Sequence, residues 1–377
     1  MPIAFKILSI LYHVVRFFHR KVGVIYVYFE CKAKARRFNK HLKTTAKRKL
    51  QPQEITRYRN KWKRVSRFVS PVYLDAVSQT FGYADENVVP WNIYFSHIEP
   101  KLNNISFALV MEDKSQLDWL YGDLVPRIFF RNIHGVFFIN KKAVQSNEEI
   151  DLSKLLGDQE KVVVKQSVDA HGGISVQVFT RKNGGFYNAR NQLLTIDFLR
   201  DAYRVNYVIQ EYIYQHDYFA QFNPSSLNTL RVMTYRSVLD NEIHVISTML
   251  RVGSFGSIVD NLKLGGYALG ITESGHLRGV GFDEKGNKME SFGEMKKSFK
   301  EVDPVHCIHQ VWETAKKAAA LHYHARVLGF DMAVDRDEHV RMIEVNTSDL
   351  AIDSIQHVNG PLFHRFTDEV IEYGMEH

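Results

Sequence analysis

The stretch MIEVN, residues 342–346, decides how the rest of this 377-residue chain is interpreted. Its apolar residues predict a strand, and side chains two positions apart in a strand point to the same face, so Glu344 and Asn346 lie together. Just upstream, GFDMAVD (residues 329–335) predicts a second strand, which carries Asp331. A hairpin of these strands would gather three oxygen ligands of the kind that Mg²⁺ shares with nucleotide phosphates. The alternative is a hairpin with one polar face.

The composition is that of a globular protein with a large buried core. The chain is 45% hydrophobic and 12% aromatic, and its length allows two or three domains. Its two cysteines, Cys31 and Cys307, are far apart and have no metal-like spacing. This usage argues against a disulfide framework and predicts a reducing compartment, the cytoplasm.

Positive charge is concentrated at the start of the chain. Residues 1–70 hold 19 Lys and Arg against two Asp and Glu, a net charge of +17, whereas the remainder carries −10. This asymmetry predicts an anionic partner. The bulky apolar residues between the charges favour an anionic membrane surface, at the inner membrane face, and the charges exclude a transmembrane span. The alternative is a helix that packs on the body with a solvated basic face. Nucleic acid is disfavoured because no nucleic-acid module accompanies the charge.

The middle of the chain alternates between strand and helix patterns. ISFALVM (105–111) and KVVVK (161–165) predict strands, and residues 304–328 predict a long helix ending at Gly329. No repeat or low-complexity segment interrupts this order. The alternation from about residue 84 onward predicts an α+β body.

A second informative stretch is VVVKQSVDAHGG, residues 162–173. A strand ends in Lys165, and a turn with His171, Gly172 and Gly173 follows. A lysine beside a glycine turn suits a polyphosphate, because glycine lets backbone N–H groups approach the oxygens. The P-loop and the GxGxxG fingerprint are both absent. The alternative is a tight glycine hairpin with a surface lysine.

The order of these motifs resembles the ATP-grasp superfamily and looks like its sugar-transfer-associated branch, which occurs with capsule and exopolysaccharide synthesis. The resemblance covers roughly residues 50–375. Its motifs, in chain order, are EDK (112–114), VVVK (162–165), QEYI (210–213), SLNTLRVMT (226–234), MLRVG (249–253), VDN (259–261), GFDMAVD (329–335) and IEVN (343–346).

The resemblance implies an α+β, ATP-grasp fold in which two α/β subdomains clasp ATP, preceded by a basic helical N-terminal region. Residues 1–83 would form this mostly helical region and residues 84–160 an α/β linker subdomain. Residues 161–377 would form the nucleotide- and magnesium-binding subdomains.

The resemblance also implies three sets of site residues. The residues expected to bind ATP are Lys114, Lys165, His171, Gly172, Gly173, Gln210, Glu211, Tyr212, Ile213, Asn228 and Asn261. Those expected to bind Mg²⁺ are Asp331, Glu344 and Asn346. The catalytic residues would be Arg231, Arg251 and Lys165, since arginine is a planar, bidentate donor for carboxylate or phosphoryl oxygens.

The activity that the resemblance implies is ATP-dependent carboxylate–amine ligation through an acyl phosphate. The expected partners are a carboxyl-bearing sugar and an amino acid or other amine, in the synthesis of a surface polysaccharide. The opposite polarity, an acyl group added to an amino sugar, remains open. The alternatives are an ATP-dependent sugar kinase on the same fold and a membrane-associated nucleotide-binding scaffold.

Overall fold

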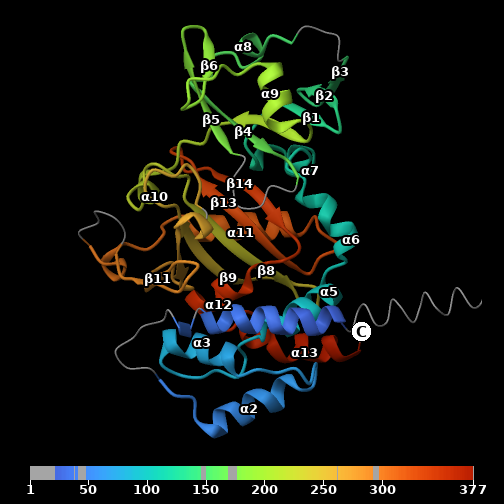
Figure 1. Ribbon diagram of the computed structural model, residues 1–377, viewed down its shortest axis with the longest axis vertical. Helices are drawn as coiled ribbons and strands as arrows, with labels where there is room; N and C mark the ends of the chain where they lie inside the picture. The colour runs from blue at the N-terminus through green and yellow to red at the C-terminus, as the bar shows by residue number, and fades with distance from the viewer. Residues whose placement is uncertain are drawn as a thin grey trace, which may run out of the picture.

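The computed structural model describes residues 22–37, 39–40, 48–145, 150–168, 176–260, 262–291 and 297–376. In these ranges the chain forms two antiparallel sheets and a base of helices, so the predicted α+β class is confirmed. Figure 1 shows one sheet at the top, the second in the middle and the helical base below it.

The upper sheet has the strand order β3-β2-β1-β7-β4-β5-β6, and all neighbouring pairs are antiparallel. Its strands are β1 Ile128–Ile133, β2 Val136–Ile139, β3 Lys142–Val144, β4 Lys161–Gln166, β5 Gln177–Lys182, β6 Gly185–Tyr187 and β7 Tyr207–Glu211. Helices α8 (Leu152–Leu155) and α9 (Ile196–Tyr203) pack on its apolar residues. The predicted division between residues 160 and 161 therefore runs through one continuous sheet.

The central sheet has the order β12-β11-β10-β9-β8-β13-β14. Its strands are β8 Thr229–Arg236, β9 Ile243–Val252, β10 Tyr267–Ile271, β11 Leu277–Phe282, β12 Lys288–Met289, β13 Val327–Val334 and β14 Val340–Asn346. The hairpin of β13 and β14 was predicted from the sequence and is confirmed.

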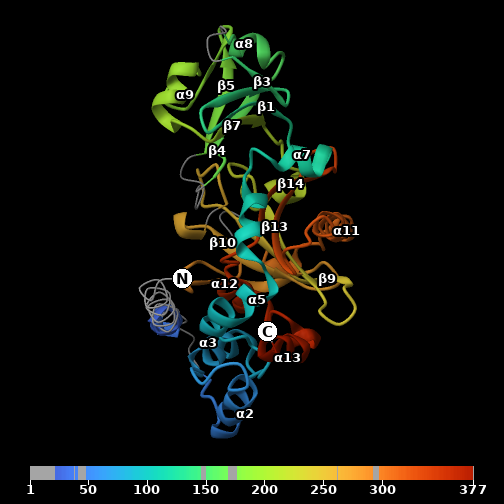
Figure 2. The same cartoon turned by 90° about the vertical axis from the view of Figure 1, so that its right-hand side faces the viewer.

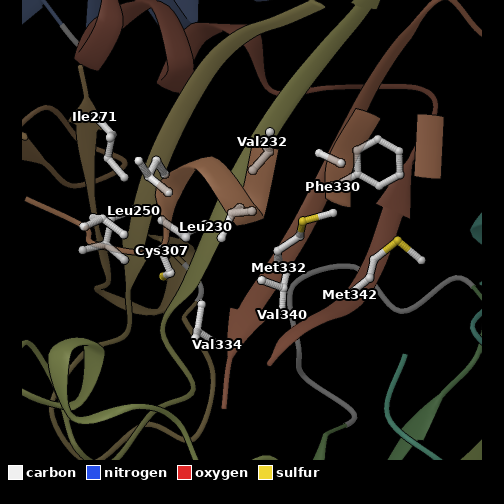
Figure 3. Close-up of a cluster of buried hydrophobic side chains, with 14 of the residues drawn as sticks. Leu230, Val232, Leu250, Ile271, Cys307, Phe330, Met332, Val334, Val340 and Met342 are labelled. Carbon is white, nitrogen blue, oxygen red and sulfur yellow. The ribbon is translucent and has the colours of Figure 1, made fainter. Parts of the chain in front are cut away.

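Helix α11 (Ile308–Ala319) covers one face of this sheet. Figure 3 shows side chains of this core, among them Val232 of β8 and Phe330 and Met332 of β13. Because side chains alternate along a strand, Arg231, which precedes Val232, and Asp331, which lies between Phe330 and Met332, point to the opposite face of the sheet.

That opposite face is covered by the helical base over only part of its length. The base buries Met233, Tyr235 and Met249 together with its own apolar residues. Its elements are a helix over residues 22–37, α2 Pro52–Trp62, α3 Val72–Phe81, α4 Trp91–Ile93, the π-helical η1 Tyr94–Ile98, α5 Glu99–Leu102, α12 Ile352–Asn359 and α13 Thr367–Glu376. Both ends of the described chain thus meet in the base, as Figure 2 also shows. Among the described residues no helix has both the length and the apolar character needed to cross a bilayer.

The remaining helical elements connect these parts. They are α6 Ile105–Ala108, η2 Leu109–Glu112, α7 Leu117–Tyr121, η3 Gly122–Leu124, α10 Asp217–Ala220, η5 Leu262–Leu264, η6 Phe299–Glu301 and η7 His364–Phe366. The strand predicted at 105–111 is wrong, because α6 and η2 occupy this segment. A short apolar run carries no periodicity that separates a strand from a helix. Phe107 and Val110 are exposed, so the apolar character of this run does not come from burial in a sheet.

The long helix predicted over residues 304–328 is also wrong in extent. Helix α11 ends at Ala319, and β13 begins at Val327. Val327 pairs with Tyr235 of β8, so its backbone belongs to the sheet ladder. Gly329, predicted as the helix end, lies inside β13 opposite Asn346. The sheet register overrides the local helical pattern there.

Candidate active site

The β13–β14 hairpin places the predicted oxygen ligands side by side. Asp331 pairs directly with Glu344, and Gly329 pairs with Asn346. A register shift follows Asp331, between it and Met332, so the strand is irregular at the acidic residue. Asp331 is buried, whereas Glu344 and Asn346 are partly exposed. The three side chains therefore lie together at one edge of the central sheet.

Two arginines hold Asp331. Arg231 lies opposite it on β8 and binds it through two nitrogens, Nε to Oδ1 and Nη2 to Oδ2, the latter at 2.9 Å. Arg251 on β9 reaches the same Oδ2 through Nη1 at 2.7 Å. Burial disfavours the ionised form of Asp331, but the two guanidinium groups outweigh it and hold the pKa of this carboxyl well below its usual range.

Arg251 also links a second acidic residue to the site. Its Nη2 lies 3.3 Å from Oδ1 of Asp260, and the hydroxyl of Thr229 donates to the other oxygen of Asp260. Burial raises the pKa of Asp260, and the charge of Arg251 offsets part of that rise. Asp260 was not chosen from the sequence; its place beside Asn261 in the VDN motif was the available signal.

Glu344 pairs with the predicted nucleotide lysine Lys114. The Lys114 Nζ lies 3.1 Å from Glu344 Oε2, and Arg231 Nη2 lies 3.9 Å from Oε1 of the same carboxylate. The side chain of Glu344 is 25% exposed, so a ligand can reach it. The connection between η2 and α7, far away in sequence, thus brings a cation to the end of β14.

Glu112, two residues before Lys114, holds the backbone that follows Asn346. Its Oε1 accepts from the Thr347 N–H at 2.6 Å and from the Thr347 hydroxyl at 2.7 Å. The Ser348 N–H donates to the same oxygen at 3.2 Å. The EDK motif predicted only its lysine as a site residue, so this role of Glu112 was not expected from the sequence.

Lys165 joins the cluster from the upper sheet, where it lies near the end of β4. It is 5% exposed, and burial together with the nearby charge of Lys114 lowers the pKa of Lys165 to about 7. Glu344 and Asp331 partly offset this shift. The two sheets therefore contribute to one cluster of cations and carboxylates, with Lys165 on one side and the β13–β14 hairpin on the other.

The model of the family described as sugar-transfer associated ATP-grasp matches residues 95–370, well over half of the chain. The chain belongs to this family. The resemblance inferred from the motif order, including the ATP-grasp fold, is thereby confirmed.

Solved structures give distant ATP-grasp matches. A biotin carboxylase from Campylobacter jejuni is 14% identical with a TM-score of 0.41, over 71% of this chain and 47% of that one. The ATP-grasp ligase PsnB, complexed with Mg and ADP, is 13% identical with a TM-score of 0.38, over 72% and 62%. An L-amino acid ligase from Bacillus licheniformis is 10% identical with a TM-score of 0.33, over 69% and 47%. The chain thus spans less than two thirds of each of these proteins. No curated protein sequence matches it significantly.

ATP-grasp enzymes use ATP with Mg²⁺, and the donor set of this site fits a magnesium ion in part. Asn346 donates from its side-chain nitrogen to Gly329 O at 3.3 Å, which leaves its oxygen as the atom for a metal. Glu344 is accessible. Asp331 differs, because both of its oxygens accept hydrogen bonds from guanidinium groups, Oδ1 from Arg231 and Oδ2 from both arginines. Glu344 and Asn346 would hold the ion, and Asp331 could join them through Oδ1, which accepts only one of these bonds.

The predicted ATP-binding segment over residues 210–213 lies at the end of β7. Glu211 is tied to the start of β1, since its N–H donates to Arg127 O at 2.8 Å and its Oε2 accepts from the Arg127 N–H at 3.2 Å. Gln210 and Ile213 are buried, and the ring of Tyr212 has the Lys161 ammonium 5.1 Å from its centroid. These contacts hold the segment against β1, and its contact with ATP stays a prediction.

Asn228 has a structural role within the chain. Its side-chain nitrogen donates to Phe219 O at 2.9 Å and Asn223 O at 2.8 Å, and its oxygen accepts from the Ser226 hydroxyl at 2.7 Å. It is 1% exposed. These bonds favour a loop-holding role over the contact with ATP predicted from the sequence.

Four predicted residues lie outside the described part of the chain: His171, Gly172, Gly173 and Asn261. Their predicted contacts with ATP stay predictions.

A second group of possible metal ligands, His216, His306 and Glu338, lies within reach of one ion. Its geometry argues against that use. The Tyr218 N–H donates to Nδ1 of His216 at 3.1 Å, so the neutral ring carries its proton on Nε2. That nitrogen lies 3.6 Å from Glu338 and carries the proton, so it offers no lone pair to a metal ion.

Proposed function

We propose that this protein is an ATP-dependent carboxylate–amine ligase that forms an amide through an acyl phosphate. Its substrates would be a carboxyl-bearing sugar and an amino acid or other amine, in the assembly of a surface polysaccharide. The family's association with sugar transfer supports the sugar. The observation that carries the proposal is the convergence of Lys165, Lys114, Arg231 and Arg251 on Asp331 and Glu344, from both sheets.

This cluster suits the transfer of a phosphoryl group to a carboxylate. ATP with Mg²⁺ would supply the γ-phosphoryl group, which makes the acyl carbon reactive toward an amine. Lys114 and Lys165 are the cations placed to hold the phosphates, one from each sheet. Arg231 and Arg251 are held side by side by Asp331, so their remaining N–H groups form a fixed set of donors for anionic oxygens.

The proposed reaction has two steps, each with its own nucleophile. A carboxylate oxygen of the sugar bonds to the γ-phosphorus and ADP leaves. The amine nitrogen then bonds to the acyl carbon, phosphate leaves, and the amine gives up a proton. The burial of the cluster favours this sequence, because a water-poor site protects an acyl phosphate from hydrolysis.

The experiment is a hydroxylamine trap with the full chain, MgATP and a panel of uronic acids, with and without amino acids. We expect ADP release and a hydroxamate from one acid of the panel, and an amide once the right amine is added. Arg231→Met should lower the rate of hydroxamate formation by about 10²–10³-fold. The matched control is Arg236→Met on the same strand, whose guanidinium binds Ala319 O at 3.1 Å, away from the cluster.

Other outcomes would replace the proposal. A phosphosugar formed without any hydroxamate would make the protein a sugar kinase. Absence of MgATP binding by the folded wild-type chain would leave a binding or scaffold role. A hydroxamate formed from the amino acid instead of the uronic acid would reverse the polarity and make an amino sugar the acceptor.

A further inference from the structure

The helix over residues 22–37 presents two different faces. One face packs on the base: Ala35 is fully buried, and Cys31 contacts the apolar core of α3, α12 and their neighbours. Lys34 forms an ion pair of 2.6 Å with Asp353 of α12, and the ring of Tyr28 lies 5.5 Å from that of Phe68. Within the described part of the chain, these contacts of the inner face hold the helix on the base.

The outer face of the same helix is apolar along its first half. The exposed side chains follow the spacing i, i+3, i+4 and i+7, which places them in one row. They are Val22 at 63% exposure, Ile25 at 43%, Tyr26 at 65% and Phe29 at 62%. Figures 1 and 2 show this helix (blue) on the outside of the base, next to α3.

The same row continues as a basic surface. Arg36 and Lys40 follow at helical spacing, and Arg37 lies beside them; all three are exposed. Glu30 is the only acidic residue among the first fifty. The outer face therefore combines bulky apolar side chains with cations and has almost no negative charge.

We propose that this outer face docks on an anionic lipid surface. Apolar side chains would enter the boundary between headgroups and acyl chains, while the cations contact lipid phosphates. An acidic polymer would match the cations but would leave Val22, Ile25, Tyr26 and Phe29 in water. A second copy is disfavoured because four side chains are a small area beside the about 800 Å² per partner of a stable interface, and the +17 head would repel its copy.

The proposal does not depend on the ligase chemistry. It concerns the surface to which the protein binds. The row of exposed residues lies on the helical base, where the helix contacts α3 and α12, and not at the cluster around Asp331.

The test is co-sedimentation of the full-length protein with vesicles. We would compare vesicles of phosphatidylcholine alone with vesicles containing an equal part of phosphatidylglycerol, at low and high salt. The wild type should sediment with the anionic vesicles and less so at high salt. Ile25→Gln with Phe29→Gln should weaken partitioning by about tenfold or more. Arg36→Glu with Arg37→Glu should weaken it by at least about tenfold, but only for anionic vesicles.

The matched control is Val136→Gln with Leu239→Gln, two exposed apolar residues elsewhere. It should partition like the wild type. All these side chains are exposed, so thermal unfolding should be unchanged in every variant, which separates lost binding from lost folding.

Three results would overturn the proposal. The wild type could stay in the supernatant with both vesicle types, which would mean that the row is covered in solution. The apolar variant could partition like the wild type, which would leave a purely electrostatic contact. A change from dimer to monomer in the apolar variant without vesicles, in sedimentation equilibrium, would assign the row to a contact between copies.

Discussion

Arg251 and Asp331 form an ion pair of 2.7 Å although their strands are not neighbours. β8 lies between β9 and β13, so the long side chain of Arg251 crosses one strand to reach the carboxylate. The strand that it crosses carries Arg231, which binds the same Asp331. The acidic residue that the sequence suggested as a metal ligand is therefore the centre of an arginine pair.

This arrangement predicts a stability cost for removing Arg251. Arg251→Met should lower the free energy of unfolding by about 3–5 kcal/mol, because Asp260 and Asp331 stay buried while each loses a guanidinium partner. Urea denaturation of the two proteins measures the difference. Arg190→Met, a change at an exposed arginine, should have almost no effect.

The double variant sharpens this prediction. Arg251→Met with Asp260→Asn should be more stable than Arg251→Met alone, because no buried carboxylate at position 260 then needs a cation. Strictly additive losses would show that the Arg251–Asp260 contact does not contribute as the geometry suggests.

Lys165→Met should separate binding from stability. The native state holds this ammonium in a buried place that lowers its pKa to about 7, so its removal should leave the melting temperature equal or higher. Affinity for MgATP should fall by roughly 10–100-fold, as expected for a lost charge-assisted hydrogen bond to phosphate. Calorimetry and thermal unfolding measure the two effects. Lys182→Met, at an exposed lysine of β5, serves as the control, and unchanged MgATP affinity in Lys165→Met would remove this lysine from the nucleotide site.

Glu112 should contribute to stability by accepting hydrogen bonds from the backbone after β14. Glu112→Ala should cost about 1–3 kcal/mol, since the N–H groups of Thr347 and Ser348 lose their acceptor. It should also weaken the magnesium dependence of nucleotide binding, because these residues follow Asn346 directly. Glu112→Gln keeps an acceptor oxygen and should stay close to the wild type. Equal losses in the two variants would point to the charge of Glu112 instead.

The buried His322 should make the folded protein less stable in acid. Burial and the nearby Arg236 lower the pKa of His322 from 6.5 to about 4, and its Nε2 is hydrogen-bonded to the Tyr121 hydroxyl. The native state thus binds this proton less readily than the unfolded chain. The contribution is fully present above pH 6.5 and is lost as the pH falls toward 4, by up to about 3 kcal/mol.

Denaturant titrations between these pH values test the point. His322→Gln should flatten the acid side of the stability profile, and His276→Gln, at an exposed histidine, should not. An acid slope that is identical in His322→Gln and the wild type would contradict the assignment.

The sequence predicted what depends on local periodicity. The alternation in 342–346 was enough to place Glu344 and Asn346 on one face, and the neighbouring strand supplied Asp331. The same reasoning failed at 105–111, where an apolar run without periodicity forms helical turns on the surface. The start of β13 at Val327 was missed because the pairing of Val327 with Tyr235, far away in sequence, decides its conformation.

The partners within the site were beyond such reasoning. Whether Asp331 meets a metal or two arginines depends on strand order, which no local pattern contains. The same holds for Glu112, whose carboxylate acts on residues more than two hundred positions away. The residue types of the site and the hairpin of β13 and β14 were predictable from the sequence, whereas contacts between elements distant in sequence were not.

Lys114 occupies the joint between the two halves of the molecule. Its backbone N–H donates to Ser167 O of the upper part at 3.0 Å, while its ammonium is paired with Glu344 in the central sheet. Ser167 lies two residues after Lys165, so this one backbone hydrogen bond ties the segment that carries Lys165 to the segment that carries Lys114. The spacing of the two lysines is therefore set by a backbone contact as well as by their side chains.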